Sequence, residues 1–264
     1  MFFHENLKIT ANVALGSSYF ILDLALEHKL NIEPGNFVMI AFPNRTDLLL
    51  PRPFSVFDVN NRVMRILYKV VGIGTEYLSK FNVGEFVECS YPLGNSFPKP
   101  DGFDTVFLIG GGFGAAPLNL FLHTFPPDKL NYQAFFLLGA KTQKELPYIN
   151  NLGENAKNNL EIATDDGTNG FKGFVTELFT SKIAVIEKTA KILVLSCGPD
   201  AMTKALAKLI KSMQNEKTIS AFFSLEEKMA CGFGVCNGCV VETLAGYKRV
   251  CKEGPIFDID DIIL

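Results

Sequence analysis

The chain has 264 residues, of which 48% are hydrophobic and 20% charged, and its formal net charge is −3 at pH 7. This composition is that of a folded globular protein and excludes an intrinsically disordered chain. The length allows two domains or three small ones, and the weak negative charge gives no general attraction to nucleic acid or anionic lipid. No apolar stretch approaches the roughly 18 residues that a membrane-spanning helix requires. We therefore expect neither a nucleic acid nor a membrane as partner.

The N-terminus and the cysteine count predict a cytoplasmic protein. MFFHENLKIT lacks the basic region and long apolar run of a targeting sequence. Six cysteines, four of them clustered near the C-terminus, suit a reducing compartment in which thiols serve as ligands. The histidines, His4, His28 and His123, fall in no nucleophile or metal motif, so histidine-based acid–base chemistry is not expected. No role is predicted for Cys89.

Residues 7–92 alternate short apolar runs with turn residues. The runs are YFILDLAL, FVMIAF, SVFDV, VMRILYKVV and FVECSYPLG, separated by Pro34-Gly35, Asn60-Asn61 and Gly72. Strands at this spacing predict an antiparallel barrel or sandwich, and closure into a barrel would remove exposed sheet edges.

The pattern changes after Pro98-Lys99-Pro100, which suits a linker. Continuous apolar runs follow at 105–110, 134–139, 160–164, 191–197 and 218–223. Between them lie segments of helical character, notably APLNLFLHTF and DAMTKALAKLIKSM, so this part predicts βαβ units in a parallel sheet. The expected fold class is mixed β and α/β: an antiparallel β-barrel at 1–98, a parallel-sheet α/β domain at 99–223 and a small cysteine-bearing domain at 224–264.

Two segments of the barrel-like part carry groups suited to a phosphorylated ligand. In Arg52-Pro53-Phe54-Ser55, arginine can hold a phosphate through its planar fork and serine can offer a hydroxyl to a phosphate or a flavin ring. The second segment runs from Leu67-Tyr68-Lys69, at a strand end, to Gly74 and Thr75, whose N–H and hydroxyl groups could bind phosphate. A strand followed by a capped helix, without any ligand, is the alternative.

Two further segments lie at the ends of predicted parallel strands. Gly110, Gly111 and Gly112, in GGGFGAAP, stand between a strand and a helix, where a glycine backbone can approach a pyrophosphate; the sequence departs from GxGxxG, and a plain turn is the alternative. Cys197, Gly198 and Pro199 close another strand at the carboxyl edge, where open α/β sheets bind ligands. This cysteine could face a planar ring or be an ordinary buried thiol.

The cysteine run near the C-terminus carries the strongest signal. It reads C-x4-C-x2-C-x11-C and comprises Cys231, Cys236, Cys239 and Cys251, with Gly232, Gly234 and Gly238 between the first three. The first three cysteines match the plant-type 2Fe-2S pattern, and glycines that can take positive φ let a loop wrap closely around a cluster. The x11 gap is much shorter than in plant ferredoxins, so a different surrounding fold is expected. A structural zinc site and a disulfide framework are the alternatives.

In chain order, RPFS, YKVVGIGT, GGGFGAAP, CGPDAM and CGFGVCNGC with a trailing GPIF resemble the ferredoxin-reductase-like superfamily, and most of all the electron transfer subunits of dihydroorotate dehydrogenase B. The resemblance covers nearly the whole chain, and the cysteine run with GPIF is its most specific part. It implies an FAD-binding barrel, an NAD-binding α/β domain and a 2Fe-2S domain. It also implies that FAD is bound by Arg52, Pro53, Phe54, Ser55, Leu67, Tyr68, Lys69, Gly74 and Thr75, and the cluster by Cys231, Cys236, Cys239 and Cys251.

The resemblance further implies an FMN-containing catalytic subunit that oxidises dihydroorotate in pyrimidine biosynthesis, assembled with this chain as a heterotetramer of two copies of each. Electrons would pass from that subunit through the cluster and FAD to NAD⁺, because a flavin exchanges both single electrons and hydride equivalents. NAD is expected over NADP, since Asp165 and Asp166 would repel a 2′-phosphate, unless they form an ordinary acidic turn.

Three other assignments compete. The small subunit of NADH-dependent ferredoxin:NADP oxidoreductase is similar across the FAD and nucleotide parts, but that family is expected to carry aspartate where this chain has Cys231. The second is another flavin and iron–sulfur reductase of the oxygenase type. The third, from a different class, is a zinc-stapled binding protein, which would lack the visible absorption of a flavin and a 2Fe-2S cluster.

Overall fold

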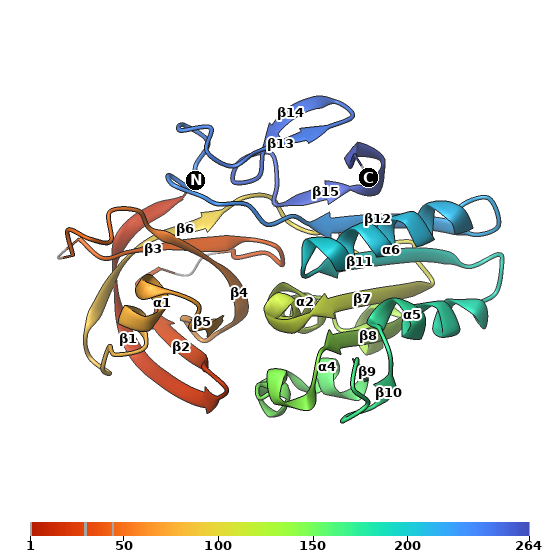
Figure 1. Ribbon diagram of the computed structural model, residues 1–264, viewed down its shortest axis with the longest axis horizontal. Coiled ribbons are helices and arrows are strands. Elements are labelled where there is room, and N and C mark those ends of the chain that lie inside the picture. Colours follow the sequence, from red (N-terminus) through yellow and green to blue (C-terminus); the bar gives the residue numbers. More distant parts are fainter. Residues whose placement is uncertain (1, 29–30, 44, 264) are drawn as a thin grey trace.

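The N-terminal third of the chain folds as a closed antiparallel barrel (Figure 1). The computed structural model describes residues 2–28, 31–43 and 45–263. Around the barrel the strands pair in the order β1-β2-β5-β4-β3-β6. Their bounds are β1 Phe3–Gly16, β2 Tyr19–Ala25, β3 Phe37–Ala41, β4 Arg52–Asn60, β5 Val63–Lys69 and β6 Phe86–Leu93, with helix α1 at Ile73–Leu78. The predicted antiparallel barrel is confirmed.

Apolar side chains from alternate positions of these strands fill the barrel, because successive residues of a strand point to opposite faces. Buried examples are Leu7, Ile9, Leu22, Leu24, Val38, Ile40, Met64 and Ile66. Strand β1 is the longest of these strands, but its sequence contains no continuous apolar run that would predict it. Its outward residues are polar and break up the apolar sequence, so it reads as FHENLKITANVALG.

The second part contains a seven-stranded sheet in the order β10-β9-β8-β7-β11-β12-β15. The strands are β7 Thr105–Gly111, β8 Gln133–Ala140, β9 Leu160–Thr164, β10 Phe171–Lys172, β11 Lys191–Cys197, β12 Thr218–Ser224 and β15 Ile256–Asp258. Pairing is parallel from β10 to β12, which confirms the predicted sheet, whereas β15 pairs antiparallel with β12. Strand β15 was not predicted from the sequence because it is only three residues long.

Helices cover both faces of the sheet, as its continuous apolar strands predict. Helices α2 (Ala115–Thr124) and α4 (Glu154–Asn158) pack on one face against residues such as Leu108 and Leu195, where barrel side chains including Tyr19 and Phe57 join the same core. Helices α5 (Val175–Ala184) and α6 (Asp200–Met213) pack on the other face. Helix α2 therefore lies between sheet and barrel.

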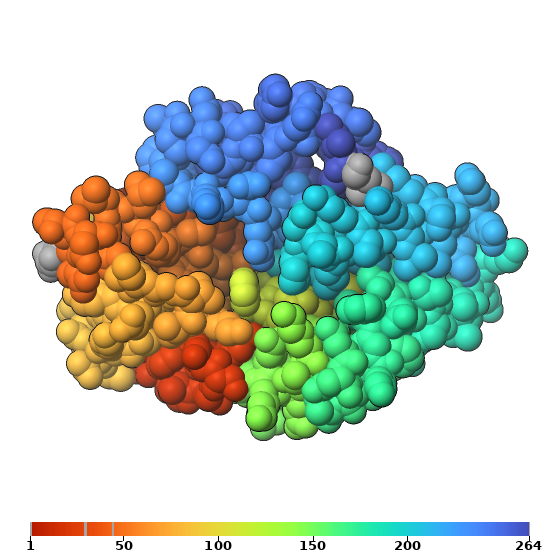
Figure 2. Space-filling model, in the orientation of Figure 1, coloured from red at the N-terminus to blue at the C-terminus, as the bar shows by residue number. Residues whose placement is uncertain are grey.

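The C-terminal residues lie across both parts. In Figure 2 the blue residues rest on the orange barrel on one side and on the cyan part of the chain on the other. They form a hairpin of β13 (Val240–Thr243) and β14 (Gly246–Arg249), followed by β15. Asn95, just beyond β6, binds this segment by donating from Nδ2 to the carbonyl oxygens of Glu253 (3.0 Å) and Ile256 (2.8 Å) and accepting from the Ile256 N–H (2.9 Å).

The remaining helical segments are single turns. They are η1 Gly112–Gly114, α3 Pro127–Leu130, η2 Gln143–Glu145, η3 Ile149–Asn151 and η4 Ile259–Asp261. Within the described ranges, no helix is both long enough and apolar enough to cross a membrane.

Candidate functional site

A cleft of about 1050 Å³ opens where the barrel, the sheet and the C-terminal segment meet. Most of the residues predicted to bind FAD line it: Arg52, Pro53, Phe54, Ser55, Leu67, Tyr68, Lys69 and Thr75. Cys197 and Ala116 line the side formed by the sheet domain, and residues 224–229 line a third side. Segments distant in sequence thus form one largely apolar cavity, which has the size and character of a site for a large planar cofactor.

Arg52 and α1 meet at one edge of the cleft. A Cβ atom at Gly74 would come within 2.8 Å of Arg52 Nε, so this close approach requires glycine. The Arg52 guanidinium also donates a hydrogen bond to the Leu50 carbonyl oxygen. Thr75 Oγ1 accepts from the N–H groups of Val71 (2.9 Å) and Gly72 (3.2 Å) and donates to the Gly72 carbonyl (3.0 Å). The threonine hydroxyl therefore closes the turn, and the guanidinium is the cationic group available to an anion here.

Aromatic rings form the barrel side of the cleft. Tyr68 stacks on Phe20 with centroids 5.3 Å apart and meets Phe54 edge-on at 5.9 Å. The Tyr68 hydroxyl donates to Asn12 Oδ1 (2.9 Å), and burial raises the pKa of this tyrosine well above its usual value. Since Asn12 also donates to the Leu78 carbonyl (2.9 Å), a single hydrogen-bonded chain fixes the Tyr68 ring relative to α1.

The two predicted strand-end motifs of the sheet interlock. A Cβ at Gly111 would meet Pro199 Cδ at 2.6 Å, and one at Gly114 would lie 2.1 Å from the Cys197 carbonyl oxygen. Gly110 is similarly close to the Leu138 side chain. Of the three predicted nucleotide-binding glycines, Gly112, at φ +56°, is the one with free space beside it. Much of the glycine pattern is thus explained by strand-end packing, which brings the loop against Cys197-Gly198-Pro199.

Cys197 is buried in this junction, with 3% of its surface exposed. Burial, with a smaller contribution from Glu226, raises the pKa of its thiol to about 12. The thiol is therefore neutral at physiological pH. A neutral, apolar sulfur at the wall of the cleft suits contact with a planar ring, as expected for a cysteine at the carboxyl edge of the sheet.

The structure adds a tyrosine pair that the sequence did not reveal. The buried Tyr148 hydroxyl donates to the Gly112 carbonyl oxygen, and its ring lies 5.7 Å from that of Tyr19 in the barrel. Lys69 Nζ lies 5.1 Å from the centre of the Tyr19 ring and 4.0 Å from Glu145 Oε1. Tyr148 and Tyr19 thereby connect the loop at residues 110–112 to strand β5, which ends at Lys69. No local motif marks these residues, because they converge from four separate segments.

The predicted cluster ligands lie together in the C-terminal segment. Cys239 and Cys251 are each 2% exposed within the core that joins sheet and hairpin, whereas Cys231 is half-buried and Cys236 is exposed. The Cys251 N–H points at Cys239 Sγ (3.4 Å) and the Gly238 N–H at Cys236 Sγ (3.4 Å). Backbone donors aimed at sulfur are the arrangement that stabilises bound thiolates.

The loop between the first three cysteines takes its shape from left-handed residues. Gly232 (φ +81°) and Gly234 (φ +88°) occupy that region, as expected, but Asn237 (φ +56°) does so in place of its neighbour Gly238. A Cβ at Gly232 would lie 2.4 Å from Met39 of the barrel, so the loop packs tightly on β3.

The thiol of Cys231 faces that of Cys236 and the thiol of Cys251 faces that of Cys239, while Cys231 also lies close enough to Cys251 to raise the pKa of Cys251. Burial opposes ionisation of Cys231, but N–H groups of Cys236, Phe233 and Val235 outweigh it and lower its pKa to about 6.

The spacing of the thiols bears on the two metal alternatives. A tetrahedral zinc ion would hold all four sulfurs about 3.8 Å apart, given Zn–S bonds of about 2.3 Å. Among the described residues, the only three-ligand group with all atoms within 4.8 Å is Glu5, Glu27 and His28. In a two-iron cluster each iron takes two of the four cysteines, so this ligand set does not require all four sulfurs to lie within one tetrahedron.

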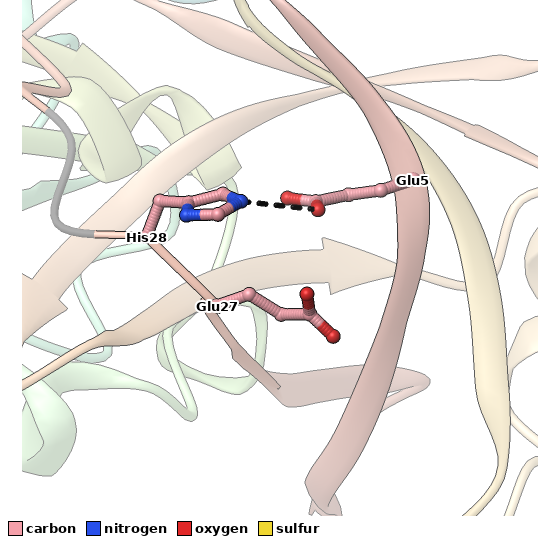
Figure 3. Close-up of side chains that lie close together, drawn as sticks. All are labelled: Glu5, Glu27 and His28. Carbon is pink, nitrogen blue, oxygen red and sulfur yellow. Dashed lines mark ion pairs between the residues drawn. The ribbon is translucent and has the colours of Figure 1, made fainter.

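The Glu5, Glu27 and His28 group lies on the barrel, outside both the cleft and the cysteine site (Figure 3). His28 Nε2 is 4.0 Å from Glu5 Oε2, and Glu5 also accepts a hydrogen bond from the Tyr91 hydroxyl. The contacts are those of a surface ion pair, and no function is assigned to the group.

Comparison with known proteins identifies the family. A model described as the iron–sulfur cluster binding domain of dihydroorotate dehydrogenase B matches residues 226–263, and one described as an oxidoreductase NAD-binding domain matches residues 108–208. A protein of Aquifex aeolicus named dihydroorotate dehydrogenase B (NAD(+)), electron transfer subunit homolog, is 36% identical over 98% of both chains. The corresponding electron transfer subunit of Caldanaerobacter subterraneus subsp. tengcongensis is 37% identical over 97% of both.

The chain belongs to the family of dihydroorotate dehydrogenase B electron transfer subunits. The resemblance drawn from the sequence is thereby confirmed, with the oxidoreductase class and the iron–sulfur and NAD-binding regions.

Solved structures show how widely the fold of this family is used. The structure of the NADH-dependent reduced ferredoxin-NADP oxidoreductase superposes with a TM-score of 0.80 and 24% identity, over 97% of this chain and 89% of that one. The structure of a ferredoxin NADP+ reductase from Neisseria gonorrhoeae, with bound FAD and NADP, superposes with a TM-score of 0.69 and 13% identity. The match covers 84% of this chain and 99% of that one. At these identities the likeness shows the ferredoxin-reductase-like fold alone.

Proposed function

We propose that this chain is the electron transfer subunit of an NAD-dependent dihydroorotate dehydrogenase in pyrimidine biosynthesis. The observation that carries the proposal is the continuity of its two sites. Residues 224–229 line the cleft, and the first predicted cluster ligand, Cys231, follows two residues after Met229. A flavin and an iron–sulfur cluster together supply conversion between hydride and single-electron transfer. Similarity over almost the full length to proteins named for this role supports the same assignment.

In this proposal FAD occupies the cleft. The Arg52 guanidinium binds the pyrophosphate beside the first turn of α1, where Gly74 and Thr75 lie. Phe54 and Tyr68 provide the apolar wall, Ser55 a hydroxyl, and the remaining contacts come from Pro53, Leu67 and Lys69, which all belong to β4 or β5.

NAD binds at the carboxyl edge of the sheet. Gly110, Gly111 and Gly112 and the adjoining Cys197, Gly198 and Pro199 form the floor of that site, and Cys197 also lines the cleft. Asp165 and Asp166 follow β9 and disfavour a 2′-phosphate by charge repulsion. Hydrogen bonds from the hydroxyl and N–H of Thr168 lower the pKa of Asp166, so that its carboxylate is ionised throughout the neutral range.

The cluster is held by Cys231, Cys236, Cys239 and Cys251. Cys231 and Cys236 lie nearer the surface than the other two cysteines, in a loop where Phe233 is 44% and Val235 is 72% exposed. Exposed apolar residues beside a redox site suit docking of a protein that delivers electrons, and the proposed partner is an FMN-containing catalytic subunit, two copies of each chain forming a heterotetramer. We also propose that the domains divide between residues 98 and 99 and between residues 223 and 224. The proposed location is the cytoplasm.

Anaerobic purification of the untagged native protein tests this function. We expect a coloured complex that contains FAD, FMN, two iron and two sulfide per copy of this chain, and that reduces NAD⁺ with dihydroorotate. A colourless, iron-free chain would rule out the proposal in favour of a zinc-stapled protein. Recovery of a large ferredoxin-linked subunit in place of the FMN protein would transfer the assignment to the ferredoxin:NADP oxidoreductase.

A further inference from the structure

One arginine joins the two loops that carry the cysteines. Cys231, Cys236 and Cys239 belong to the loop before β13, whereas Cys251 follows β14. Arg249, the last residue of β14, donates from Nη1 to the carbonyl oxygen of Gly234, at the centre of the first loop, over 2.6 Å. Arg249 therefore links the first loop to the end of β14, where the second loop begins.

The same side chain is fixed by Glu253 beyond the second loop. Arg249 Nε donates to Glu253 Oε2 (3.0 Å) and Nη2 donates to Oε1, so the pair is bidentate. The Arg249 backbone N–H also donates to Glu253 Oε2 (2.8 Å). Both side chains are about 30% exposed, at 29% and 30%, so solvent screens the pair only in part. Bidentate geometry presents Nη1 to the first loop in one orientation.

Few polar contacts join the first loop to the rest of the protein. Among the described residues, the bond from Arg249 is the one side-chain hydrogen bond between residues 231–238 and the rest of the chain, and the Gly234 N–H also faces the Cys251 thiol. The other support is packing: Gly232 lies on Met39, Gly234 lies against the Lys252 side chain, and Phe233 stacks on Phe2 with centroids 5.8 Å apart. Packing limits how far the loop can move, whereas the Arg249 bond sets its distance from Cys251.

We propose that Arg249, held by Glu253, is a positioning residue that sets the spacing of the two cysteine loops and thereby the retention and reduction potential of the iron–sulfur cluster. The inference rests on the proposed function, since it requires that the four cysteines bind a cluster. Residues that orient metal ligands typically change metal affinity 10–100-fold when they are removed.

The charges of the pair give a second, independent consequence. Reduction adds negative charge to the cluster, so a nearby cation favours the reduced form and a nearby anion opposes it. Replacing Arg249 with glutamine removes the cation and leaves Glu253 unpaired, which lowers the potential. Replacing Glu253 with glutamine leaves the cation alone, which raises it.

The test compares Arg249→Gln, Arg249→Lys and Glu253→Gln with Lys248→Gln. The control removes the same charge from the adjacent residue, whose side chain makes no hydrogen bond or ion pair among the described residues. Each variant is purified anaerobically, and far-UV circular dichroism and FAD content confirm folding. The measurements are iron and sulfide per chain, the rate of iron release to a chelator, and the midpoint potential from the EPR signal of the reduced cluster.

We expect Arg249→Gln to release iron about tenfold or more faster than the unchanged protein, with a lower potential, and Glu253→Gln to have a higher potential. Arg249→Lys keeps the positive charge but lacks the planar guanidinium that makes the bidentate contact with Glu253. The midpoint potential of its cluster should therefore stay near that of the unchanged protein, while iron release should be faster. Lys248→Gln should match the unchanged protein. Unaltered release in Arg249→Gln, or potentials that move in the same direction in Arg249→Gln and Glu253→Gln, overturns the inference. An unchanged protein that binds FAD but no iron refutes the proposed function instead.

Discussion

Gly74 lies directly against Arg52, and the absence of a side chain at position 74 lets the guanidinium lie across the first turn of α1. A Cβ atom there would come within 2.8 Å of Arg52 Nε and 3.3 Å of Cζ. Gly74 of the GIGT sequence, in helix α1, is therefore a packing requirement of Arg52 from RPFS, at the start of strand β4.

Replacing Gly74 with alanine should displace Arg52 and weaken FAD binding about tenfold, or about 1.4 kcal/mol, because the cationic partner of the pyrophosphate moves. The dissociation constant of FAD, from fluorescence titration of the deflavinated protein, is the measurement. Gly72→Ala is the matched control, since nothing lies within 4 Å of a Cβ at that position. Equal affinities in the two variants would contradict this role of Gly74.

A Gly114→Ala variant tests the junction between the glycine loop and Cys197. The added Cβ would stand 2.1 Å from the Cys197 carbonyl oxygen, a contact that only backbone movement can relieve. We expect a loss of about 3 kcal/mol in the free energy of urea unfolding, with weaker NADH binding. Gly153→Ala, whose nearest neighbour would be 3.7 Å away, should be close to neutral. Comparable stability of the two variants would show that the junction is loosely packed.

Asp166→Asn should reduce the preference for NADH over NADPH about tenfold, measured as the ratio of kcat/KM for the two nucleotides. The substitution removes the charge that repels a 2′-phosphate but keeps an acceptor for Thr168, so the turn is preserved. Asp128→Asn, in the remote helix α3, is the control for general charge effects. An unchanged ratio would mean that the acidic turn does not face the ribose.

Asn95→Ala should destabilise the attachment of the cluster-bearing segment to the barrel by about 3 kcal/mol, because three side-chain hydrogen bonds are lost at about 1 kcal/mol each. Hydrogen exchange at residues 253–256 should accelerate, while exchange inside the barrel stays the same. Ser96→Ala, which removes one bond to Glu33 (2.9 Å), is the control and should cost about 1 kcal/mol. Protection at 253–256 that survives the loss of Asn95 would argue against this attachment.

The agreement between sequence and structure is best where the signal is local. The parallel strands such as β7 and β11 are continuous apolar runs because both of their faces are buried, and among the barrel strands β4 ends at Asn60 and β6 is followed by Gly94. Cysteine spacing is similarly local, since one loop must supply three ligands to one cluster. Strands β1, β10, β13, β14 and β15 were not anticipated, because the first is masked by polar outward residues and each of the others is only two to four residues long.

The sequence by itself determined the fold class, the order of the parts and the chemistry of the cysteine run, because period, turn residues and ligand spacing are properties of neighbouring residues. Only the tertiary structure decided which residues meet: that residues 224–229 line the same cleft as Arg52 and Cys197, that Tyr148 holds the glycine loop, and that Arg249 reaches Gly234. These contacts join segments far apart in the chain. Hydrogen bonds and packing between such segments depend on three-dimensional placement and leave no periodic trace along the sequence.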